Sequence, residues 1–162
     1  MTEPTPAVLH RVDELQQRYI RALDDIDMSA WLATFAEDPA ASYVCISAEN
    51  ENRGLHLALM LDDCYARLQD RVTFITKVWA GTFQPYRTRH LVQRVWCEQG
   101  NGVVLARSNF SIVATPGDGA SMLLAAGSYV DRLVDDGSTI RILERRAVYD
   151  TTVLPRYIVY PF

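Results

Sequence analysis

The second half of the sequence constrains the fold most, because long stretches of alternating apolar and polar residues are separated there by short turns. The stretches cover residues 87–97, 103–115, 121–134 and 139–153. The turns between them are rich in Gly, Asn and Asp: Gln99-Gly100-Asn101-Gly102, Pro116-Gly117-Asp118-Gly119 and Asp135-Asp136-Gly137-Ser138. Turns of this kind connect antiparallel neighbours. The sequence therefore predicts four strands joined by sequential hairpins.

The N-terminal part has helical periodicity instead. Apolar residues recur every three or four positions from Val8 to Leu23, which predicts an amphipathic helix. Asp27 can cap a short second helix, because its carboxylate can accept hydrogen bonds from the first free N–H groups. Pro39 is expected to stop that helix. Its apolar residues are Trp31, Leu32 and Phe35.

The region between residues 42 and 79 mixes the two patterns. Residues 42–47 and 55–61 have strand character, and the polar turn 49–54 between them predicts a hairpin. Asp62 or Asp63 then suits the start of a third helix, whose apolar stripe runs from Tyr65 to Trp79.

Helices followed by strands are typical of an α+β domain. We find no repeat, low-complexity tract or linker, so residues 1–162 are expected to form a single domain. The order of the elements resembles the cone-shaped fold of nuclear-transport-factor-like (SnoaL-like) domains, in which three N-terminal helices pack on a curved, mostly antiparallel sheet.

The two faces of the predicted sheet differ in charge. Alternation in the stretch 103–115 places Arg107 on the face opposite the apolar residues Val104, Ala106, Phe110 and Ile112. Strict alternation in the last stretch groups Glu144 and Arg146 with Ile140, Ile142 and Val148. Buried charges are costly unless they are paired. The charged stripe therefore lines a polar cavity, meets another chain or faces solvent, and these alternatives remain open.

Composition excludes several classes of function. The net charge is −4 and Lys77 is the only lysine, so no basic surface for nucleic acid is expected. No apolar run approaches the roughly 20 residues that span a bilayer, and the N-terminus lacks the pattern of a signal peptide. We expect a cytoplasmic protein whose three cysteines (Cys45, Cys64 and Cys97) are free thiols.

Residues that could hold a metal are few. The histidines His10, His56 and His90 lie on three different predicted elements. A Rieske cluster needs two Cys and two His ligands in closely spaced pairs, and no cysteine here is followed at two or three residues by histidine. We therefore expect no metal or cofactor site in this chain.

Acid–base chemistry remains as an alternative. Asp24 or Asp25, at the end of the first helix, could meet His90, and also Tyr43, across a pocket and act as a general base with its partner. The simpler interpretation is that these carboxylates cap or pair locally. A third hypothesis is a module that binds a small molecule in the same cavity without catalysis.

The final residues are unusually apolar. Five of the six residues in Tyr157-Ile158-Val159-Tyr160-Pro161-Phe162 are apolar or aromatic, whereas chain ends are usually polar and loose. We expect this segment to dock, either on this domain or on a partner.

Several segments together resemble the β-subunit family of ring-hydroxylating dioxygenases. They cover nearly the whole chain in the same order: Tyr19-Ile20-Arg21-Ala22-Leu23-Asp24-Asp25, Trp31 with Phe35-Ala36-Glu37-Asp38, Glu49-Asn50 with Arg53-Gly54-Leu55, Asp62-Asp63 with Leu68 and Asp70-Arg71-Val72, Tyr86-Arg87-Thr88-Arg89-His90-Leu91-Val92, Ala126-Gly127-Ser128-Tyr129-Val130-Asp131, and Glu144-Arg145-Arg146-Ala147-Val148-Tyr149-Asp150. The segment 49–55 resembles members that act on benzoate-, anthranilate- or salicylate-like acids.

The resemblance implies a non-catalytic small subunit in a cytoplasmic assembly of three large and three small chains. It also implies that the large subunit carries a Rieske iron–sulfur cluster and a mononuclear iron, and that other copies of the small chain are partners. We expect contacts with the large subunit at charged positions of the sheet, since arginine is favoured at interfaces. The candidates are Arg87, Arg89, Arg107, Glu144 and Arg146.

Overall fold

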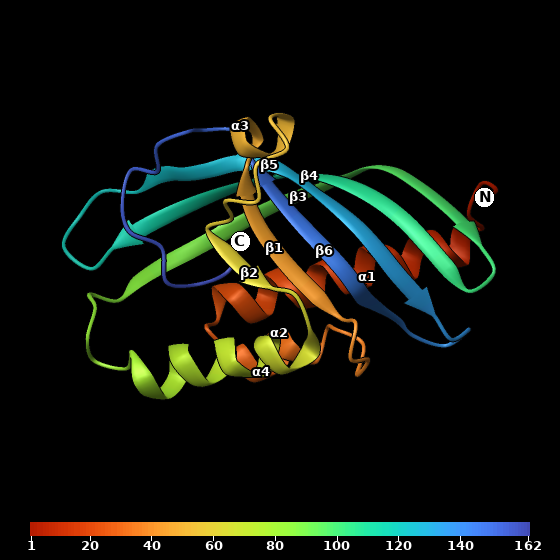
Figure 1. Cartoon of the computed structure of the whole chain (residues 1–162), viewed down its shortest axis with the longest axis horizontal. Helices are drawn as coiled ribbons and strands as arrows, with labels where there is room; N and C mark the ends of the chain where they lie inside the picture. The colour runs from red at the N-terminus through yellow and green to blue at the C-terminus, as the bar shows by residue number, and fades with distance from the viewer.

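The computed structural model describes residues 1–162, and its main feature is a curved six-stranded sheet that covers the helices α1, α2 and α4 (Figure 1). The strand order is β2-β1-β6-β5-β4-β3. All neighbours are antiparallel except β1 and β6, which are parallel. The α+β prediction is confirmed. The elements are α1 (Pro6–Asp24), α2 (Met28–Leu32), β1 (Ser42–Ser47), α3 (Ala48–Asn52), β2 (Met60–Asp62), α4 (Tyr65–Thr73), the π-helical turn η1 (Phe74–Val78), β3 (Tyr86–Gly100), β4 (Val103–Pro116), β5 (Met122–Asp135) and β6 (Ile140–Tyr149).

Helix α1 lies along the concave side of the sheet. Its N-cap residue Thr5 accepts a hydrogen bond from the Val8 N–H group, and Pro6 occupies the first turn, where no N–H donor is needed. The predicted apolar stripe from Val8 to Leu23 is buried in the core. Asp27 caps α2 through the Ala30 N–H group at 2.9 Å, as predicted. However, α2 ends at Leu32, before Phe35 and Pro39.

The predicted hairpin between β1 and β2 is only half correct. The two strands do pair antiparallel, but residues 48–52 form the helix α3 instead of a turn. Ser47 caps this helix by accepting a hydrogen bond from the Asn50 N–H group at 3.2 Å. Acidic residues in its first turn also stabilise the helix, because their negative charge lies at the positive end of the helix dipole. Strand β2 has three residues instead of seven, because Leu57 and its neighbours in the connection are largely exposed.

The start of α4 also differs from the prediction. The residue before the helix is Cys64, which makes no capping hydrogen bond. Asp62 lies in β2 instead, where its two carboxylate oxygens accept hydrogen bonds from the Arg71 guanidinium at 3.0 Å. Neither Asp62 nor Asp63 is therefore the cap: the ion pair with Arg71 holds Asp62 in the strand, and Asp63 pairs with Arg67 at 3.2 Å.

A bulge in the last hairpin changes which residues of β6 face inward. Arg132 pairs with Glu144 and Leu133 pairs with Ile142, so Leu143 is an extra residue. Because each residue beyond the bulge switches sides, Arg145 is buried and Glu144 lies on the outer face with Arg146. The predicted grouping of Glu144 and Arg146 with Ile140 and Ile142 is therefore wrong. Strand β6 also ends at Tyr149, four residues before the predicted end.

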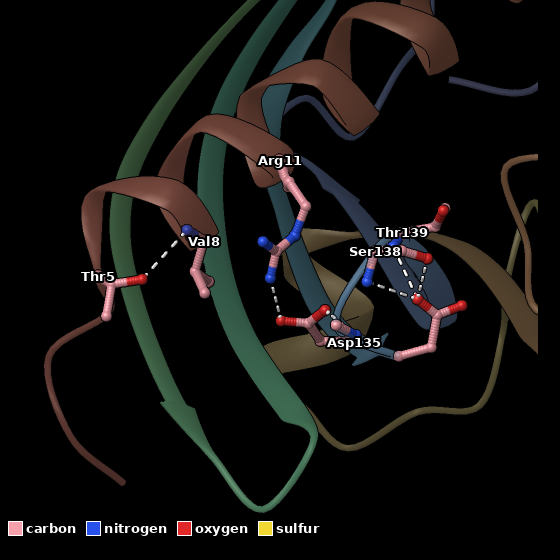
Figure 2. Close-up of polar contacts among 8 residues, drawn as sticks. Thr5, Val8, Arg11, Asp135, Ser138 and Thr139 are labelled. Atoms are coloured by element: carbon pink, nitrogen blue, oxygen red, sulfur yellow. Dashed lines mark hydrogen bonds and ion pairs between the residues drawn. The ribbon is translucent and has the colours of Figure 1, made fainter.

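The final segment after β6 has no helix or strand and folds back to the concave side of the sheet, where Phe162 is buried (Figure 1). The sequence left open whether this segment docks on its own domain or on a partner, and in the structure it docks on its own domain. At the other end of the cone, Arg11 of α1 donates a hydrogen bond to Asp135 at the end of β5, at 2.6 Å (Figure 2). The three cysteines are free, and only Cys45 is buried. Burial raises the pKa of the Cys45 thiol to about 12.

Candidate functional site

The outer, convex face of the sheet carries all five charged residues predicted for an interface. Four of them are exposed on alternating positions of three strands, and Arg146 is half-buried. These are Arg87 and Arg89 on β3, Arg107 on β4, and Glu144 and Arg146 on β6.

Three of these residues come together in the middle of the face. Arg107 pairs across strands with Trp96 on one side and Val130 on the other, and Val130 pairs in turn with Arg146. Glu144 lies two residues from Arg146 and binds Arg132 at 3.1 Å. Because facing residues of adjacent strands are close neighbours, this row forms one continuous surface.

This surface contains a shallow groove, which we call the outer groove. It has a volume of about 750 Å³ and is bounded by Val95, Trp96, Leu105, Arg107 and Val130. Three of its apolar side chains are largely exposed: Trp96 at 44 %, Val130 at 46 % and Val95 at 49 %. A bulge in β3 between Arg94 and Trp96 turns both Val95 and Trp96 outward. Exposed apolar surface rimmed by charge is typical of a protein interface.

Arg87 and Arg89 lie apart from the outer groove. They precede Trp96 by nine and seven residues on β3, which at roughly 3.3 Å per residue separates them by about 20 to 30 Å. Their strand neighbours across β4 are Thr115 and Val113. Arg146 differs from them in forming an ion pair, in which its Nε donates to Glu51 of α3 at 3.1 Å.

The alternative acid–base pair is assembled in the structure. The Nδ1 atom of His90 lies 2.6 Å from Oδ1 of Asp24, and the His90 N–H group donates to Oδ2 at 3.2 Å. Thr88 also donates to Asp24, at 3.1 Å. A carboxylate accepts only, so Nδ1 carries the proton. The other ring nitrogen, Nε2, is buried without a hydrogen-bond partner.

Asp25 and Tyr43, the other residues considered for acid–base chemistry, make no hydrogen bond with His90. Asp25 is the C-terminal cap residue of α1, and its backbone N–H group bonds to the carbonyl oxygen of Arg21. The Tyr43 hydroxyl bonds to Phe162 instead of His90. Neither Asp24 nor His90 contributes to the outer groove. The geometry therefore supports a local pair that ties the end of α1 to β3.

The most buried charged group was missed by the sequence analysis. Arg145 is fully buried and donates to Asp131 at 2.8 and 2.7 Å and to the side-chain amide oxygen of Gln16 at 2.8 Å. Its guanidinium also lies over the rings of Tyr19 and Tyr129, at 4.0 and 4.3 Å from their centroids. Burial acts to lower the pKa of Arg145, but the Asp131 carboxylate outweighs it and raises the pKa above its usual value. Only the bulge before Arg145 turns it inward.

A second groove lies between α1 and the turn joining β5 to β6. It has a volume of about 380 Å³, and Arg11, Arg18 and Arg21 contribute to its wall. Two of these arginines are engaged: Arg11 with Asp135 and Arg18 with the Ile140 carbonyl oxygen at 3.2 Å. Arg11, Arg18 and Arg21 are spaced by seven and three residues, and this helical spacing could have indicated from the sequence that they share one face of α1.

No group of three or more His, Cys, Asp and Glu side chains comes together in a way that could hold a metal ion. No helix combines the length and the apolar character needed to cross a membrane.

Comparison with known proteins identifies the relatives of this chain. The family described as ring hydroxylating beta subunit matches residues 18–156. The small subunit of anthranilate 1,2-dioxygenase from Burkholderia cepacia is 28% identical over 148 residues, which are 91% of this chain and 89% of that protein.

Solved structures show the same fold. The beta subunit assigned to an aromatic-ring-hydroxylating dioxygenase from Novosphingobium aromaticivorans is 28% identical, with 95% of each chain covered and a TM-score of 0.83. The beta subunit of benzoate 1,2-dioxygenase from Burkholderia mallei is 20% identical, with 93% of each chain covered and a TM-score of 0.72, and supports the fold alone. The predicted cone-shaped fold is confirmed. Because the family match extends over most of the sequence, this chain belongs to the beta-subunit family of ring-hydroxylating dioxygenases.

Proposed function

We propose that this chain is the non-catalytic small subunit of a multicomponent aromatic-ring-hydroxylating dioxygenase, and that it supports the assembly of a separate catalytic large subunit. The oxygenase would contain three large and three small chains, in the cytoplasm, with copies of the small chain also in contact. Rieske cluster and mononuclear iron would belong to the large subunit. The substrates would be carboxylated aromatic compounds, as the name of the anthranilate relative suggests.

The observation that carries this proposal is the outer groove. It combines exposed apolar side chains with the exposed guanidinium of Arg107, and both aromatic residues and arginine are enriched at interface centres. Trp96 would be the anchor, with Arg107 beside it and Arg146 held by Glu51. Arg87 and Arg89 would make a second contact further along β3. One hydrophobic core draws on α1 and on all four long strands, which supports treating residues 1–162 as a single domain.

The test is co-expression of the small chain with the large chain encoded beside it, followed by native mass spectrometry and a product assay. Trp96→Glu places a charge at the centre of the proposed interface, so we expect it to abolish co-purification. The matched control is Val78→Glu, an equally exposed apolar residue on the helical side of the molecule. If Trp96→Glu assembles as well as the control variant, the outer groove is not the interface.

The pair of Asp24 and His90 supports a second candidate, a free-standing isomerase or dehydratase of the cone fold. Its 2.6 Å contact is the geometry that a base and its orienting carboxylate require. In that case the isolated chain would act on a small substrate, and Asp24→Asn would remove the activity while Asp25→Asn would not. The buried and unpartnered Nε2 would be the proton acceptor.

A further inference from the structure

The final residues of the chain fill the interior of the cone by contacts with three tyrosines from three different elements. The Tyr86 hydroxyl accepts hydrogen bonds from the N–H groups of Val159 and Tyr160, at 3.0 and 3.3 Å. The Tyr43 hydroxyl accepts one from the Phe162 N–H group at 2.8 Å. The Tyr19 hydroxyl donates to the Phe162 carbonyl oxygen at 2.7 Å. A buried tyrosine hydroxyl needs a hydrogen-bond partner, and here the backbone of one short segment supplies the partners of all three hydroxyls.

The Phe162 ring packs against aromatic side chains. The ring is almost fully buried, and its centroid lies 5.8 Å from that of Tyr149 in an edge-to-face arrangement and 6.2 Å from that of Phe110. Such geometry favours a planar ring over an aliphatic side chain.

Two hydrogen-bond donors converge on the Phe162 carbonyl oxygen. The hydroxyls of Tyr19 and Tyr43 lie 2.7 and 3.4 Å from this oxygen. Burial raises the pKa of Tyr19 to about 12, so its hydroxyl remains protonated and able to donate at neutral pH. The Arg145 guanidinium stacks on the Tyr19 ring at 4.0 Å, and this nearby positive charge strengthens the phenol as a hydrogen-bond donor.

We propose that the interior of the cone is a binding site for a small aromatic carboxylic acid, and that Phe162 occupies it as an internal substitute. The ligand ring would lie against Phe110 and Tyr149, and a carboxylate oxygen would replace the Phe162 carbonyl oxygen between Tyr19 and Tyr43. This inference does not depend on the proposed subunit role, because every contact is internal to the chain.

The occupying segment is suited to displacement. Residues 150–162 form no helix or strand, and few contacts hold them outside the core. The Asp150 N–H group donates to the Ala126 carbonyl oxygen at 2.8 Å, Tyr157 accepts a hydrogen bond from the Gln84 N–H group at 3.1 Å, and Arg156 stacks on Tyr86 at 3.9 Å. An intramolecular occupant competes at an effective concentration of roughly millimolar order, so a free acid should bind the wild-type chain weakly.

The experiment uses the full chain with the substitution Phe162→Gly and 3-phenylpropanoate as the probe, because this acid spaces its ring and carboxylate as phenylalanine does. Removing the buried ring weakens the competing segment, so the apparent affinity measured by calorimetry should rise by about tenfold or more over wild type. Adding Tyr19→Phe to Phe162→Gly should weaken binding about fivefold, since one hydrogen bond is lost. Tyr65→Phe is the matched control, at a partly exposed tyrosine outside the site.

Toluene, which has the ring but no carboxylate, tests whether Phe162→Gly merely creates an apolar cavity or exposes a site for the acid. Toluene should bind Phe162→Gly without any dependence on the Tyr19 hydroxyl. If 3-phenylpropanoate shows no dependence either, or does not bind Phe162→Gly, the proposal is overturned.

The wild-type chain gives a readout that does not require the variant to fold. Displacing the final segment should expose Arg156. With 3-phenylpropanoate at 10-fold excess over its apparent dissociation constant, about nine-tenths of the chains should have the segment displaced, so tryptic cleavage after this residue should accelerate by roughly tenfold or more over the ligand-free chain. An unchanged cleavage rate in the presence of the acid would contradict the proposal.

Discussion

The Arg145 guanidinium lies 2.7 Å from the Asp131 carboxylate, and both side chains are completely shielded from solvent. Arg145→Met leaves this carboxylate buried without its counter-charge, which we expect to lower the free energy of unfolding by about 3–5 kcal/mol. The double variant Arg145→Met, Asp131→Leu removes both charges and should recover part of that loss. Urea unfolding of the single and double variants measures the difference. A double variant no more stable than Arg145→Met would contradict this account of the pair.

The contact between Asp24 and His90 is expected to be structural. Asp24→Asn disturbs the hydrogen bonds that Asp24 accepts from Thr88 and His90, so the free energy of unfolding should fall by roughly 1–3 kcal/mol. Asp25→Asn, at the neighbouring exposed residue, is the control and should change little. In the co-expressed complex, the turnover per assembled enzyme should be the same for both variants. A turnover lost only in Asp24→Asn would instead assign the pair a role in the reaction.

Gly127 is required by the close approach of β5 to β6. A Cβ atom at this position would overlap the carbonyl oxygen of Val148 and lie 2.8 Å from the Tyr149 Cα atom. Both are backbone atoms that cannot rotate away. We expect Gly127→Ala to destabilise the protein by about 3 kcal/mol or more, at the upper end of overpacking effects. Thermal unfolding should show no comparable effect for Gly117→Ala, where the added atom meets nothing within 4 Å.

Acid stability should depend on the turn between β5 and β6. Hydrogen bonds from the Thr139 and Ser138 N–H groups and from the Ser138 hydroxyl lower the pKa of Asp136 from 3.8 to about 2. Because this pKa is lower in the folded state, the stabilisation is complete above pH 3.8 and is lost as the pH falls through about 2.

Asp136→Ala should therefore lower the melting temperature at pH 7, and the difference from wild type should shrink as the pH is lowered toward 2. Asp118→Ala, in the turn between β4 and β5, is the control, since this exposed carboxylate makes no hydrogen bond in the structure. A melting-temperature difference that stays constant down to pH 2 would contradict the assignment.

Periodicity predicted the parts of the fold whose residues alternate regularly. Helix α1 and strand β4 follow from it because each buries one regular stripe, and β3 and β5 follow over most of their length, on either side of a bulge in each pairing. Strand β6 does not, because the extra residue Leu143 reverses the alternation halfway along. That reversal is what hid Arg145 from the sequence analysis, while it left Glu144 and Arg146 on the outer face.

The candidate interface could be predicted in its charges but not in its apolar part. The arginines stand out in the sequence, whereas Trp96 fits a core residue as well as an interface residue, and only the bulge before it turns the side chain outward. Helix α3 was missed for a different reason. Its five residues are too few for a periodic stripe, and only the Ser47 cap and the acidic first turn identify it.

The parallel pairing of β1 with β6 has a consequence for the biosynthesis of this protein. Ser42 pairs with Glu144, about 100 residues further along, so β1 and β2 leave the ribosome long before their neighbour exists. Strands β3, β4 and β5 can pair as hairpins while they emerge. At about 5–20 residues per second, however, the N-terminal third must wait roughly 5–20 s for the last strand. During that interval β1 lacks its neighbour β6, so we expect the apolar faces of α1 and β1 to remain exposed and to favour aggregation of the nascent chain.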